Sequence, residues 1–145
     1  MLPNFCILPE YPQRDESCNR PESAEDVYKR QVTTGYNGAP AGIKTCMERG
    51  ECLREKKGIA SGTHAEICYA IHAEQNAIIQ AARLGISIDG ATLYCTHQPC
   101  VICAKMIVNA GIRRVVYQEG YPDDFAVEML KEGGVILERY VEGQA

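Results

Sequence analysis

The chain has 145 residues, 46% of them hydrophobic, and a formal net charge of −4 at pH 7. This length suits one domain with one sizeable core, and the acidic balance argues against a nucleic acid or a membrane surface held by bulk electrostatics. No apolar run is long enough to span a bilayer, and the start lacks a signal-peptide pattern. The 8 cysteines are therefore better explained by metal binding in a reducing cytoplasm than by a secreted disulfide framework.

Residues 1–31 carry mixed charges and several prolines without a helical period, and their one strand candidate is residues 5–8. We expect a non-native or disordered leader, which would be a chimeric, frameshifted or misassembled start joined near Gln31. A divergent native leader is the alternative, and sequencing the source locus would decide between the two. The domain proper is then residues 32–145.

The regular part of the chain opens with a strand. Residues 32–36 are rich in β-branched and aromatic side chains, and they end at the turn pair Asn37-Gly38. Residues 41–63 form a long connection punctuated by glycine, and such loops are usually functional or mobile. A basic cluster in this connection is more often a solvated face than a phosphate site; it consists of Arg54, Lys56 and Lys57.

The second half of the chain alternates helices and strands, as an α/β fold does. The apolar spacing over residues 71–84 predicts a helix that ends at Gly85. A buried strand then leads to Pro99, a residue favoured in the first positions of a helix. A right-handed crossover after that helix makes the next strand parallel to the previous one. The other predicted elements are the strands 91–96, 113–117 and 135–137 and the helices 100–110 and 125–131.

Two short motifs carry the chemistry, His72-Ala73-Glu74 and Pro99-Cys100-Val101-Ile102-Cys103. One His and two Cys are three ligands of the kind that zinc takes at a catalytic site, with the fourth position left for water. Cysteines three apart share one face of a helix, and a helix N-terminus favours the thiolate that binds metal. Glu74 can reach the water without ligating the metal, so it is the candidate catalytic acid and base.

Two plainer interpretations of these motifs remain open. A structural zinc site would use the same ligands, although such sites usually have a fourth protein ligand. A redox Cys-x-x-Cys would need a thioredoxin-like context, which this chain lacks.

The motifs also carry a family resemblance, which covers about residue 34 to the C-terminus. It rests on residues 35–40 (GYNGAP), 71–78 (IHAEQNAI), 93–100 (LYCTHQPC), 103–107 (CAKMI), 110–112 (AGI) and 115–117 (VVY). In these blocks the chain resembles the deoxycytidylate (dCMP) deaminases of the cytidine/deoxycytidylate deaminase superfamily. The resemblance implies a three-layer α/β/α sandwich of the cytidine-deaminase-like type. The family's N-terminal helix and central first strand are missing or replaced here, because residues 1–31 do not match.

The resemblance implies an enzyme and its cofactor. The expected activity is zinc-dependent hydrolytic deamination of dCMP to dUMP with release of ammonia, which supplies dUMP for thymidylate synthesis. The metal ligands would be His72, Cys100 and Cys103, with Glu74 catalytic. The alternatives are a deaminase of another nucleobase or nucleoside, and a catalytically inactive zinc-binding remnant.

The resemblance also implies substrate contacts, which are Asn37, Ala73, Tyr121 and Arg83. Asn37 could equally be a turn residue without a ligand, and Tyr121 a turn residue packed on the core. Arg83 could contact phosphate or an effector, or it could simply complement the helix dipole.

Some members of the family bind a second, structural zinc. Its candidate ligands here are Cys46, His64 and Cys68, with Cys52 as a substitute, because His64 and Cys68 would share a face of one helix. Ordinary buried thiols are the alternative. The expected partners are a deoxynucleotide substrate, dCTP and dTTP as effectors, and further copies of the chain in a hexamer, without nucleic acid or membrane.

Overall fold

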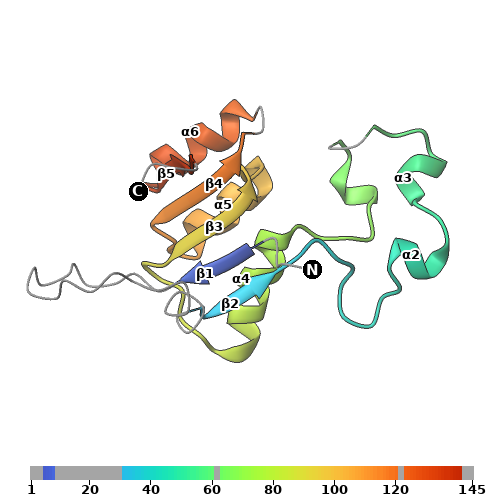
Figure 1. Ribbon diagram of the computed structural model, residues 1–145, viewed down its shortest axis with the longest axis horizontal. Helices are drawn as coiled ribbons and strands as arrows, with labels where there is room; N and C mark the ends of the chain where they lie inside the picture. Colours follow the sequence, from blue (N-terminus) through green and yellow to red (C-terminus); the bar gives the residue numbers. More distant parts are fainter. Residues whose placement is uncertain (1–4, 9–30, 61–62, 121–122, 142–145) are drawn as a thin grey trace, which may run out of the picture.

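The computed structural model describes residues 5–8, 31–60, 63–120 and 123–141. These residues form a five-stranded sheet with the order β2-β1-β3-β4-β5 (Figure 1). β1 is antiparallel to both of its neighbours, whereas β3, β4 and β5 are parallel to one another. The bounds are Phe5–Leu8 for β1, Thr33–Gly35 for β2, Thr92–His97 for β3, Arg114–Glu119 for β4 and Ile136–Arg139 for β5.

β1 lies inside the sheet, between β2 and β3. Its residue Phe5 pairs with Gly35 of β2 on one side and with Cys95 of β3 on the other. The sequence analysis expected the family's central strand to be missing or replaced, and the strand candidate of residues 5–8 occupies this place. Whether residues 1–31 are native to the protein stays a prediction.

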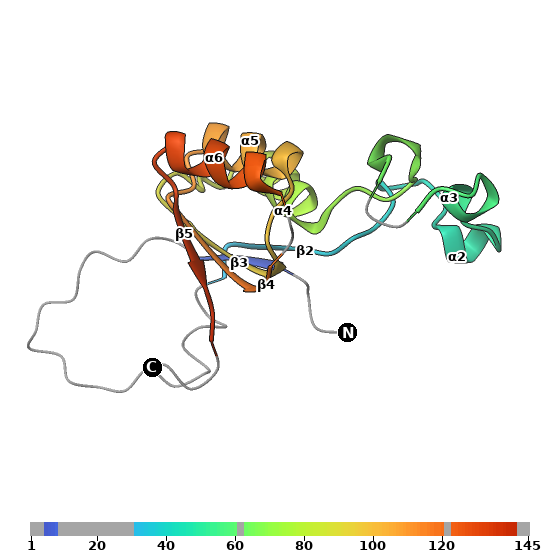
Figure 2. The same ribbon diagram turned by 90° about the horizontal axis from the view of Figure 1, so that it is seen from above.

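Three helices pack on the sheet, and all three lie on one face of it (Figure 2). Their bounds are Ala73–Leu84 for α4, Val101–Asn109 for α5 and Asp124–Glu132 for α6. The α/β class is confirmed, and the parallel pairing of β3 with β4 across α5 is confirmed too. Within the described ranges the packed helices make one layer, and the segment where the family's opening helix would lie falls outside the described residues.

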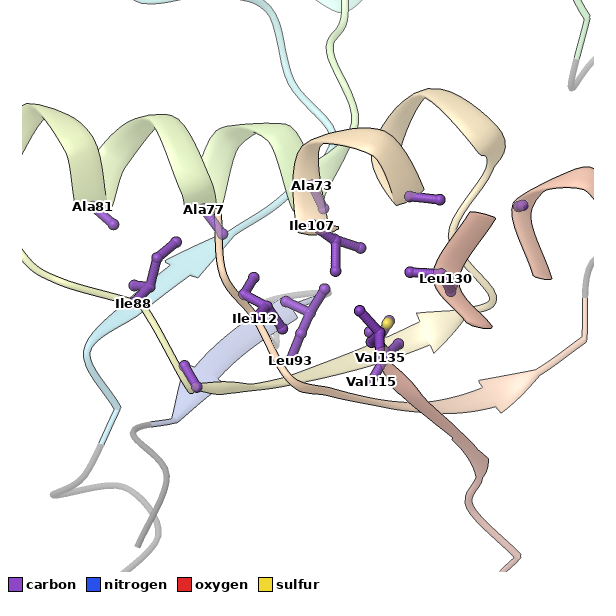
Figure 3. Packing of buried hydrophobic residues seen from close by; sticks show 14 residues of the cluster. Ala73, Ala77, Ala81, Ile88, Leu93, Ile107, Ile112, Val115, Leu130 and Val135 are labelled. Carbon is purple, nitrogen blue, oxygen red and sulfur yellow. The ribbon is translucent and has the colours of Figure 1, made fainter. Parts of the chain in front are cut away.

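The core lies between this helical layer and the sheet (Figure 3). Leu93 and Val115 come from the strands, Ile107 from α5 and Leu130 from α6, and each has 0% exposure. α4 instead turns alanines toward the sheet, and these small side chains let its backbone approach β2 closely. That close approach brings the start of α4 to the edge of the core where the ligand residues lie.

Residues 39–70, which we call the arm, extend away from the sheet (Figures 1 and 2). Main-chain hydrogen bonds between Gly38 and Ile71 join its two ends. The expected long connection contains the short helices α2, Cys46–Arg49, and α3, Leu53–Lys56, neither of which has a buried residue. No helix of the described ranges has the length and apolarity needed to cross a membrane.

Candidate active site

His72, Cys100 and Cys103 form a group that could hold a metal ion, with their ligand atoms all within 4.8 Å of one another. The Sγ atoms of both cysteines lie 3.4 Å from His72 Nδ1. Over the ranges that the structure describes, no other His, Cys, Asp and Glu side chains form such a group. One nitrogen and two sulfurs fit zinc, and three protein ligands leave a coordination position free for water.

Two helix N-termini converge to make this group. His72 is the N-cap of α4 and Cys100 is the N-cap of α5, and both have extended backbone conformations. Both helices therefore begin one or two residues later than predicted, because the ligand at each start is a cap and not a helical residue. Cys103 follows one turn into α5, where the dipole of the helix favours a thiolate.

A hydrogen bond between the two cysteines shifts their pKa values in opposite directions. The hydrogen bond from Cys103 lowers the pKa of Cys100 to about 4, and the hydrogen bond to His72 acts in the same direction. The same hydrogen bond raises the pKa of Cys103, and the burial of Cys103 raises it further. The lowered pKa of Cys100 favours the thiolate form that binds metal, and a bound divalent cation would displace the proton of Cys103.

Glu74 stands beside this group in the first turn of α4. Its side chain is only 7% exposed, and this burial raises the pKa of its carboxyl group. Cys103 lies close enough to hydrogen-bond with it. A carboxyl whose pKa is raised by burial can hold and release a proton nearer to neutral pH, as a general acid and base must.

The turn after β2 is fixed on the start of α4. The Ala73 N–H donates to Asn37 Oδ1 at 2.9 Å, and Asn76 Nδ2 donates to the Tyr36 carbonyl at 2.8 Å. A Cβ on Gly35 would lie 2.1 Å from the Ala73 carbonyl oxygen, so only glycine permits this approach. Asn37 is thus brought next to His72, and Ala73 is fully buried beneath this contact.

Sequence reasoning missed Asp123, which contacts the starts of two helices. Its Oδ1 accepts from the Ala126 N–H of α6 at 2.9 Å, and its Oδ2 accepts from the Val101 N–H of α5 at 2.8 Å. An Asp just before a predicted helix is a capping signal, so the first contact could have been predicted. The second joins residues 22 apart in sequence, and no local pattern indicates it.

Of the two remaining predicted substrate residues, the structure describes only Arg83, and it lies away from the ligand group. Arg83 is exposed in the last turn of α4, at the opposite end of the helix from His72. Tyr121 lies outside the described residues.

The second predicted ligand set is not assembled either. His64 Nδ1 pairs with Glu66 Oε1 at 2.8 Å. A 3-10 turn, Ala65–Ile67, replaces the α-helix that would have placed His64 and Cys68 on one face, and His64 has a φ of 49°. Burial raises the pKa of the Cys46 thiol, and the nearby Cys52 and Cys68 raise it further.

Comparison with known proteins agrees with the site. Residues 24–119 match the family described as the cytidine and deoxycytidylate deaminase zinc-binding region. ComE operon protein 2 of Bacillus subtilis (strain 168) is 40% identical over 112 residues, which cover 77% of this chain and 54% of that protein. The deoxycytidylate deaminase of Schizosaccharomyces pombe is 37% identical over 113 residues, 77% of this chain and 34% of that protein. The chain therefore spans about half or less of the length of these two relatives.

A solved structure resembles the fold as well. The dCMP deaminase from the cyanophage S-TIM5, in complex with dCMP and dUMP, has a TM-score of 0.64 and 29% sequence identity. The match covers 94% of this chain and 79% of that chain. The matched family region includes His72, Glu74, Cys100 and Cys103, so the converging helix starts lie within the zinc-binding region that the family's name describes. The chain belongs to the cytidine and deoxycytidylate deaminase family.

Proposed function

We propose that this chain is a dCMP deaminase that converts dCMP and water into dUMP and ammonia. The observation that carries the proposal is the three-ligand group of His72, Cys100 and Cys103 with the buried Glu74 beside it. Zinc held by these three side chains would acidify a bound water and leave room for a substrate.

Glu74 moves the proton in this mechanism. Its carboxylate takes a proton from the attacking water, and burial then favours the neutral acid that holds it. Glu74 gives this proton to the ring nitrogen, where it stays. Glu74 then takes the second proton from the hydroxyl added to the ring carbon and passes it to the amine, which leaves as ammonia. Its position in the first turn of α4, on the same turn as the His72 cap, keeps the carboxyl beside the metal ligands.

Two polar groups at the start of α4 are proposed to orient the base. The Ala73 N–H donates a hydrogen bond to Asn37 Oδ1 at 2.9 Å. A bound nucleotide would either compete for these two groups or add hydrogen bonds to them. Tyr121 is proposed as a further contact. Arg83, far along α4, would serve an effector and not the substrate.

An unpaired arginine supports a phosphorylated substrate. Arg54 lies in α3, and its buried Nε has no hydrogen-bond partner among the described residues. The hydrogen bond to Cys100 raises the pKa of His72, whereas the positive charge of Arg54 acts in the opposite direction, so Arg54 lies near the ligand group. A guanidinium with an unsatisfied donor is suited to the phosphate of a nucleotide. Lys56, by contrast, already pairs with Glu51 at 2.9 Å.

The proposed cofactor is one zinc ion per chain. A second zinc on the arm would draw on Cys46, Cys52 and Cys68, which lie near one another, and not on His64. Self-association belongs to the proposal too, because the apolar side chains of Ile79, Leu84 and Ile102 are exposed on α4 and α5. Triphosphate effectors and a cytoplasmic location remain expectations.

The test is zinc content together with ammonia release from dCMP, cytidine, deoxycytidine and guanine in parallel. We expect turnover of dCMP and about one zinc per chain. Glu74→Gln should lower turnover about 10²- to 10⁴-fold while zinc stays bound. Glu128→Gln, an exposed glutamate of α6, is the matched control. Zinc without turnover of any substrate would favour an inactive remnant, and turnover of cytidine alone would favour a nucleoside deaminase.

The phosphate contact has its own test. Arg54→Ala should raise the KM for dCMP about ten-fold or more and leave the KM for deoxycytidine unchanged, because deoxycytidine lacks the phosphate. Lys57→Ala, on the same exposed stretch of the arm, is the control. An equal change for both substrates would show that Arg54 shapes the site without touching phosphate.

A further inference from the structure

One carboxylate bridges the starts of the two helices that follow β3 and β4. Asp123 accepts the Ala126 N–H with Oδ1 and the Val101 N–H with Oδ2, at 2.9 Å and 2.8 Å. A helix N-cap ordinarily uses its side chain for its own helix alone. Asp123 caps α6 in this way and also reaches a second helix.

The second contact stands next to a metal ligand. Val101 is the residue after Cys100, which is the N-cap of α5 but makes no side-chain cap hydrogen bond of its own. The sulfur of Cys100 faces His72 instead, at 3.4 Å from Nδ1. The first turn of a helix has free N–H groups that need acceptors, and a cap that serves as metal ligand cannot supply one. Asp123 provides that acceptor from another part of the chain.

Further hydrogen bonds tie the same two segments. The Gln98 N–H donates to the Glu119 carbonyl at 2.9 Å, and Gln98 Nε2 donates to the Asp123 carbonyl at 3.4 Å. Asp123 and Val101 are both half-buried, and Pro99 between the segments is fully buried. Partial burial strengthens a charge-assisted hydrogen bond because water competes less well for its partners.

We propose that Asp123 is a positioning residue of the zinc site, which fixes the first turn of α5 so that Cys100 and Cys103 face His72. The inference rests on the proposed function in one respect, that these three side chains hold zinc. Asp123 touches no ligand atom, so its effect on the metal passes through the backbone of α5. Zinc affinity and ligand geometry should therefore depend on its second oxygen, and capping of α6 on its first.

A pair of substitutions separates these two roles. In Asp123→Ser the hydroxyl can still accept from the Ala126 N–H and cap α6, but no second oxygen is left for Val101. In Asp123→Ala both contacts are lost. Asp123→Asn keeps a single oxygen and should restore part of the effect. Thr45→Ala removes the N-cap of α2 on the arm, away from the ligand group, and is the matched control.

The readout is metal binding, measured by competition with a chromophoric chelator and by the absorption spectrum of the cobalt-substituted protein. We expect zinc affinity to fall about 10- to 100-fold in Asp123→Ser, as for other groups that support metal ligands, with a changed cobalt–thiolate band. Asp123→Ser should melt within about 4 °C of the parent protein. Thr45→Ala should bind both metals as the parent does.

Two outcomes would overturn the inference in distinguishable ways. If the parent and Asp123→Ser bind zinc equally well with the same cobalt spectrum, Asp123 only caps α6. If the parent itself takes up no zinc or cobalt, the proposed function fails and the inference fails with it. Should Asp123→Ala not fold, Asp123→Ser alone decides.

Discussion

Two sets of cysteine and histidine occur in this chain, and the fold treats them differently. His72, Cys100 and Cys103 stand at the starts of α4 and α5, which pack on the sheet, and their ligand atoms lie within 4.8 Å of one another. Cys46, His64 and Cys68 stand on the arm, whose short helices α2 and α3 bury no residue. Both sets have plausible ligand types and spacing.

The difference lies in what supports the side chains. Around the first set, the helix starts are fixed by main-chain hydrogen bonds that Asn37 and Asp123 accept and by the glycine at position 35. On the arm the described contacts of His64 and Lys56 are exposed ion pairs with neighbours in sequence. Exposed ion pairs contribute little to stability, so they do not hold a ligand set in place. A metal site needs a scaffold as well as ligands.

The largest expected effect comes from removing a ligand in each set. Cys100→Ser should lose zinc and abolish deamination, because two remaining ligands cannot hold the metal at a catalytic site. Cys46→Ser should retain zinc at the first site and most of the activity. Zinc content and ammonia release measure both variants. Activity lost equally from the two variants would show that the arm cysteines also support catalysis.

The next effect is on stability, and it separates the core from the arm. Leu93 is fully buried, so Leu93→Ala should lower the free energy of unfolding by about 2–5 kcal/mol. Met47 of the arm is 93% exposed, and Met47→Ala should change it by less than about 0.5 kcal/mol. Urea unfolding gives both values. A large loss for Met47→Ala would mean that the arm is covered in solution, for example by another copy of the chain.

The same contrast explains what could be predicted from the sequence. The ligands His72, Cys100 and Cys103 could be found because each sits at a helix start with a local signal, such as Pro99 before Cys100. The parallel pairing of β4 with β3 followed from the right-handed crossover through α5. These features depend on residues close together in the chain.

What could not be predicted depends on tertiary contacts. The Asp123 bridge to Val101 and the approach of Arg54 to His72 both join distant segments. The α-helix expected to place His64 and Cys68 on one face was wrong for a local reason, since a 3-10 turn lies there. The second ligand set itself stays a prediction. The arm's own helix α2 did have a signal, the capping box of Thr45 and Glu48, which the sequence analysis did not use.

A smaller effect is expected at two glycines, one in each region. In Gly35→Ala the added Cβ would lie 2.1 Å from the Ala73 carbonyl oxygen, so the start of α4 must shift. We expect a loss of about 1–3 kcal/mol in the free energy of unfolding, with weaker zinc binding because His72 moves too. In Gly50→Ala no atom lies within 4 Å of the added Cβ. The left-handed backbone at this position, with a φ of 72°, should lower the free energy of unfolding by about 1 kcal/mol, and zinc binding should not change. Zinc affinity unchanged in Gly35→Ala would show that β2 does not fix the ligand helix.

The smallest effect is a pH dependence confined to the arm. The Thr45 N–H donates to Glu48 Oε2 at 2.7 Å, and this hydrogen bond lowers the pKa of Glu48. The hydrogen bond from the Thr45 hydroxyl lowers it further. Because the folded pKa lies below the unfolded one, the carboxylate stabilises α2 above the ordinary carboxyl pKa, and the stabilisation is lost as pH falls through the folded pKa. The protection factors for amide exchange in α2, which are corrected for the intrinsic pH dependence of exchange, should therefore fall in acid while those in α4 stay high. In Glu48→Gln, which cannot titrate, this pH dependence should vanish. If it persists there, another group controls the first turn of α2.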